Sequence, residues 1–85
     1  MREDYYVMFH SVTVATGVKK ALEKRGISAI LLHSPKSIQM NGCSYSLRIK
    51  ANNYQDVVDA ASQTGADIMA VFKSVDGDFR EVQTP

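Results

Sequence analysis

The stretch SIQMNGCSYSLRIK, residues 37–50, decides the expected fold because a turn signal in it is followed by a regular strand pattern. Asn41-Gly42 is the strongest hairpin signal in the chain, since both central residues of a type I′ turn need a positive φ. After the turn, YSLRIK alternates apolar with polar side chains, which is typical of a strand with one buried face. The stretch therefore predicts the turn and second strand of a central hairpin.

On both sides of this hairpin the sequence predicts strands and helices in turn. Residues 5–10, 27–32 and 66–73 are rich in apolar, β-branched and aromatic side chains, which favours strands. Residues 11–26 and 52–65 show helical periodicity, with Ser, Thr or Asn at the start and Gly at the end. The predicted order is strand, helix, strand, strand, helix, strand.

This order is the split βαβ arrangement of the ferredoxin-like fold, an α+β class. Right-handed crossovers would place both helices on one face of a four-stranded antiparallel sheet. We expect one ferredoxin-like domain over residues 1–73 and a C-terminal tail over 74–85, in which Asp76-Gly77 favours a short extra edge strand from 79 to 82. Gly17, inside the first helix, is interpreted as a point of close packing on the sheet.

Alternation along the strands also predicts the two faces of the sheet. The side expected under the helices contains Val7, Phe9, Tyr45, Leu47, Ile49, Ile68, Ala70 and Phe72. The side expected to be open contains Tyr6, Met8, His10, Met69, Val71, Ser46, Arg48 and Lys73. An apolar centre with a basic margin suits a homodimer or a partner protein.

Composition excludes several classes of function. The chain has 85 residues and a formal net charge of +1, so we expect neither nucleic acid nor a membrane as its partner. Its single cysteine excludes an internal disulfide framework and a cysteine-based zinc site. The sequence contains no P-loop, dinucleotide fingerprint, metal-ligand cluster or long apolar run, so we expect no cofactor, no metal and a cytoplasmic location.

Cys43 allows two interpretations. It follows Gly42 in phase with the helix-facing residues, and a free cysteine often packs as a small buried hydrophobe. A thiol at the end of a sheet, next to a glycine, is also within reach of another protein, and the amides of a turn or a nearby cation would lower its pKa. Lys36 and Arg48 are the candidate cations. His10 and His33 could assist a thiolate, but we interpret both as solvated because no orienting carboxylate is identifiable.

The chain resembles the selenium/sulfur carrier protein-like family of small bacterial and archaeal domains over residues 5–73. The matching elements, in chain order, are Phe9-His10-Ser11, Gly26-Ile27, Pro35-Lys36, Gly42-Cys43 and Leu47-Arg48. Glycine commonly follows the cysteine in that family, whereas here Gly42 precedes it and Ser44 follows, and the loop between Pro35 and Cys43 is one residue longer.

The resemblance implies a carrier of sulfur or selenium rather than a classical enzyme, with donor and acceptor proteins as partners. Cys43 would be the atom-bearing thiol. The residues expected around its cargo are Lys36, Asn41, Gly42, Ser44 and Arg48. The alternative is a non-catalytic interaction or regulatory module that acts through the open face of the sheet, with Cys43 as a structural residue.

Overall fold

The computed structural model describes residues 4–33, 45–75 and 77–82. Its elements are β1 (Asp4–Phe9), α1 (Val12–Lys24), β2 (Ile30–His33), β3 (Tyr45–Lys50), the short 3₁₀ helix η2 (Ala51–Asn53), α2 (Tyr54–Thr64), β4 (Ala70–Val75) and β5 (Asp78–Val82). Neither helix in these ranges is long and apolar enough to cross a membrane.

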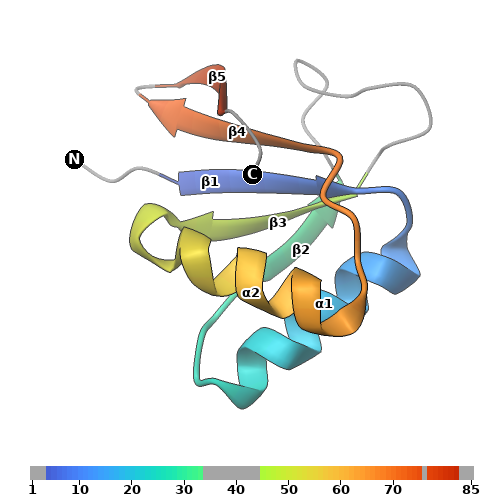
Figure 1. Ribbon diagram of the computed structural model, residues 1–85. Helices are drawn as coiled ribbons and strands as arrows, with labels where there is room; N and C mark the ends of the chain where they lie inside the picture. The colour runs from blue at the N-terminus through green and yellow to red at the C-terminus, as the bar shows by residue number, and fades with distance from the viewer. Residues whose placement is uncertain (1–3, 34–44, 76, 83–85) are drawn as a thin grey trace.

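The strands form one antiparallel sheet in the order β2-β3-β1-β4-β5 (Figure 1). The connection through α1 leads from β1 past β3 to β2, and the connection through α2 leads from β3 past β1 to β4. The predicted fold is confirmed in part: the class is α+β with two helices, but the sheet of the described residues has five strands rather than four. The fifth is the expected C-terminal edge strand, while the domain boundaries stay a prediction.

Both helices pack on the same face of the sheet and form the main core with it (Figure 1). Val7 is the register partner of Leu47 on β3 and of Val71 on β4, which carries the core across the three central strands. The fully buried members of this core are Val7, Phe9, Ala15, Val18, Leu22, Leu47, Val57, Ala60 and Val71. The helix-facing residues predicted for β1 and β3 are therefore correct.

The predicted phase of β4 is wrong. Val71 packs in the helix-side core, whereas Ala70 and Phe72 lie on the opposite face, next to Met8. Lys73 is the register partner of Tyr5 and therefore shares the helix side. The physical reason is that residues 66–69 are not in a strand, so a two-residue period counted from position 68 does not continue into β4.

The open face also differs from its prediction, because its centre is not exposed. Met8 is 0% and Ala70 1% exposed, and partly buried side chains of Tyr6, Met69, Phe72 and Phe79 pack against them. The rings of Tyr6 and Phe79 meet edge to face, with their centroids 5.1 Å apart. Ser46, in register with Met8, is also fully buried. This face has a second small core rather than an exposed apolar patch.

Three of the four ends of α1 and α2 follow the signals in the sequence, and the start of α2 does so only in part. The hydroxyl of Ser11 caps α1 by accepting a hydrogen bond from the backbone N–H of Val14 at 3.2 Å. After α1, the N–H of Ile27 donates to the carbonyl of Leu22 at 3.0 Å, and Gly26 takes the positive φ of 78° that this termination needs. Asn53 occupies the N-cap of α2, although its side chain makes no capping hydrogen bond.

Gly17 does not mark a point of close packing, contrary to our prediction. A Cβ atom built at this position would have no heavy atom within 4 Å, apart from the backbone of its own helix. The sheet therefore does not require glycine at this position.

Candidate functional site

Most of the predicted carrier site falls outside the described residues. Lys36, Asn41, Gly42, Cys43 and Ser44 all belong to residues 34–44, for which the structure gives no description. Arg48, on β3, is the one predicted site residue that the structure places. The roles assigned to the other five stay predictions.

Two paired residues bracket this segment in the chain. His33 is the last residue of β2, Tyr45 is the first of β3, and the two are register partners. Their rings lie 4.6 Å apart between centroids at an interplanar angle of 33°. Tyr45 is also in register with Phe9, which is 0% exposed. Phe9, Tyr45 and His33 form one row across three strands, which we call the anchor row.

Two exposed imidazole groups lie in the anchor row or directly beside it. His33 is exposed, and His10, which directly follows Phe9, is exposed too. Imidazoles near a thiol could hold a thiolate or accept its proton. Within the described ranges no group of three or more His, Cys, Asp or Glu side chains is placed to hold a metal ion.

Arg48 lies apart from the anchor row. It is three residues beyond Tyr45 on β3, a distance of roughly 10 Å at the rise of a strand, and the odd spacing puts it on the opposite face. Its register partners are Tyr6 on β1 and Ile30 on β2. The structure thus puts Arg48 toward the far end of β3, and its part in a carrier site stays a prediction.

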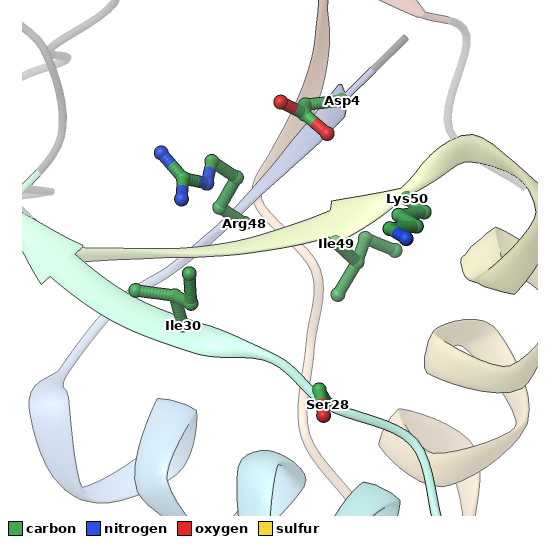
Figure 2. A pocket seen from close by; sticks show the side chains of 6 residues that line it. All are labelled: Asp4, Ser28, Ile30, Arg48, Ile49 and Lys50. Carbon is green, nitrogen blue, oxygen red and sulfur yellow. The ribbon is translucent and has the colours of Figure 1, made fainter. Parts of the chain in front are cut away.

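At that far end Arg48 lines a pocket that our reading of the sequence missed. The pocket has a volume of about 190 Å³, and its lining residues are Asp4, Ser28, Ile30, Arg48, Ile49 and Lys50 (Figure 2). Arg48 and Lys50 come from β3, Asp4 from β1 and Ile30 from β2, while Ser28 precedes β2. The available signal was the Arg-x-Lys spacing on β3, which places two cations on one face of a strand.

Tyr54, at the start of α2, is a second polar feature that the sequence did not reveal. Its ring lies 5.2 Å from that of Tyr5, and its buried hydroxyl has no hydrogen-bond partner among the described residues. Burial raises the pKa of the Tyr54 phenol, and the neighbouring Tyr5 adds to the shift. A neutral phenol under the sheet suits a packing role rather than proton transfer near neutral pH.

Comparison with known proteins identifies the family but gives no individual relative. No curated protein and no solved structure matches the chain. A family model matches residues 4–73, a span that contains the two helices, the first three strands, most of β4 and the single cysteine. The matched span is more than half of the chain. The chain therefore belongs to the family described as "Putative Se/S carrier protein-like".

Proposed function

We propose that the protein carries sulfur or selenium as a persulfide-type adduct on the thiol of Cys43. The observation that supports this function is the family match over residues 4–73, which contains the single cysteine of the chain. One cysteine is sufficient for carriage. A second thiol close by would release the cargo by forming a disulfide.

The proposed transfer is a thiol exchange. The thiolate of Cys43 attacks the outer sulfur of a donor persulfide, R–S–SH. The S–S bond of the donor breaks, R–S⁻ leaves, and Cys43 holds the atom as Cys–S–SH. The acceptor protein takes up the outer atom in a second exchange of the same kind, which restores the Cys43 thiolate. A selenium atom would travel as Cys–S–SeH.

Tyr45 of the anchor row is the described residue that lies nearest to Cys43 along the chain. Cys43 precedes Tyr45 by two residues, and each peptide unit spans about 3.8 Å, so the chain tethers the thiol to the end of β3 that the anchor row occupies. A donor and an acceptor must both reach the sulfur, so this proposal requires that the Cys43 thiol be accessible to other proteins. In this proposal Asn41 and Gly42 shape the turn, and Ser44 contacts the cargo.

The thiolate would need electrostatic support to react near neutral pH. A free thiol has a pKa of about 8.5, and a nearby cation lowers it. We assign this role first to Lys36, with Arg48 as a second candidate. A reducing compartment would keep the thiol available, which is why we expect a cytoplasmic protein.

The alternative, docking through the open face, has less support. Met8 and Ala70 at the centre of that face are 0% and 1% exposed, so they offer little apolar surface to a partner. The homodimer expected across the same face stays a prediction.

The test is the pH dependence of alkylation, followed by mass spectrometry after exposure to a persulfide donor. Because the chain contains one cysteine, iodoacetamide reports on Cys43 alone. We expect an alkylation midpoint below about 8.5 and a mass gain of one sulfur or selenium atom that Cys43→Ser abolishes. Lys36→Gln should raise the midpoint, while Lys20→Gln, an exposed site on α1, should not. An ordinary thiol midpoint with no mass gain would exclude carriage.

A further inference from the structure

The pocket at the far end of β3 has the composition of a small-anion site. We propose that it binds a small organic monoanion, whose carboxylate or sulfur oxyacid group is held by Arg48 and Lys50 and whose carbon chain lies on Ile30. This proposal does not depend on Cys43 or on the carrier function.

The pocket exists because β2 and β3 separate at this point. Their ladder includes the pair Ile30 and Arg48, but no pairing continues to Ser28 and Lys50. The space left between the strands opens to solvent, since Lys50 and Ser28 are both exposed. In Figure 2, Arg48 projects from β3 on the side where Asp4 lies, and Ile49 points the other way, toward Ser28.

Charge favours an anion in this space. Two cations and one carboxylate line the pocket, so its formal charge is +1. Within the described ranges, none of Asp4, Arg48 and Lys50 has an ion-pair partner within 4.0 Å. The guanidinium fork of Arg48 is therefore available for a bidentate contact with two oxygens of a ligand.

Size and polarity define the class of ligand more closely. A volume of about 190 Å³ is enough for a short carbon chain with one acidic group. Ile30 is 49% exposed, and a bound hydrocarbon would cover part of its side chain. Asp4 would repel a second negative charge, so a monoanion should bind more tightly than a dianion such as phosphate.

The test is NMR titration of the full-length protein with propionate and with ethanesulfonate, using propionamide as the uncharged match and chloride to keep ionic strength constant. We expect saturable shifts of the backbone amides at residues 28, 30 and 48–50 for at least one anion, with a dissociation constant on the order of millimolar. The anion that binds more tightly identifies the acidic group. Absence of saturation up to about 100 mM for both anions, or equal shifts with propionamide, would overturn the proposal.

Variants locate the site. Arg48→Gln should weaken binding by about tenfold, the effect of losing a charge-assisted contact, and Lys20→Gln should leave it unchanged. Asp4→Asn should tighten binding severalfold, because the repelling carboxylate is gone. Unchanged binding in Arg48→Gln would overturn the assignment. If Arg48→Gln does not fold, Arg48→Lys and Asp4→Asn test the anion site instead. Weaker binding in Arg48→Lys and tighter binding in Asp4→Asn would support the site. Unchanged binding in either variant would refute it.

Discussion

Replacing Gly17 by alanine should stabilise the protein, because glycine in the middle of α1 has a cost and no structural use. Glycine in a helix interior is less favourable than alanine by about 0.8–1.0 kcal/mol. The added Cβ would meet nothing within 4 Å, so no steric cost offsets the gain. We therefore expect the free energy of unfolding to rise by about 0.5–1 kcal/mol, equivalent to a rise in Tm of roughly 2–8 °C for a domain of this size.

The assay is urea unfolding followed by circular dichroism, and the matched control is the same substitution at Gly65. That glycine ends α2 at a φ of 72°, where the N–H of Ala66 donates to the carbonyl of Ala61 at 2.8 Å. A Cβ has space there too, but the left-handed conformation costs a non-glycine residue roughly 1–2 kcal/mol, so Gly65→Ala should destabilise the protein. A neutral or destabilising Gly17→Ala would refute the reasoning, since it would mean that α1 approaches the sheet more closely than the structure shows.

Two further predictions concern single hydroxyl groups. Ser11→Ala removes the cap of α1 and should lower the free energy of unfolding by about 1 kcal/mol, with Ser62→Ala, an exposed position on α2, as the control in the same urea assay. Tyr54→Phe removes a buried hydroxyl that has no hydrogen-bond partner in the described part of the chain, and it should raise stability by about 1 kcal/mol at neutral pH. Because the folded-state pKa of Tyr54 lies above its ordinary 10.0, the unfolded chain loses that proton first, so stability should fall as the pH rises above 10.0. Tyr54→Phe should make this fall shallower, and an identical pH profile in both proteins would contradict the burial of the phenol.

The sequence was sufficient to predict those structural features that depend on residues close together in the chain. The serine or threonine cap of α1, which the structure places at Ser11, the two glycine terminations and the alternation of β1 and β3 each depend on residues a few positions apart, and the structure confirms them. The phase of β4 was not predictable in this way, because it depends on where the preceding loop becomes a strand. The role assigned to Gly17 was wrong because no heavy atom lies close enough to this position for a Cβ to meet it.

In the candidate site, too, some features could be predicted from the sequence and others depend on how distant segments pack together. The family could be recognised from short motifs spread along the chain, and the family model confirms it over residues 4–73. The pocket could not be found from the sequence, because it depends on the point at which β2 and β3 stop pairing. Asp4 and Lys50 are register partners in the pairing of β1 with β3, and Ser28 joins them at the point where β2 no longer pairs with β3.

The two outer strands of the described sheet differ sharply in chemistry. β5, with the sequence DFREV, has charged side chains at Asp78, Arg80 and Glu81, all exposed, and such charges discourage pairing with another chain. β2, with the sequence ILLH, has no acidic or lysine side chain to serve that purpose, and its Ile30 is half-exposed. A foreign peptide that lengthens this sheet by strand addition should therefore pair with β2. Aggregation of the concentrated protein is expected to begin at this edge of the sheet.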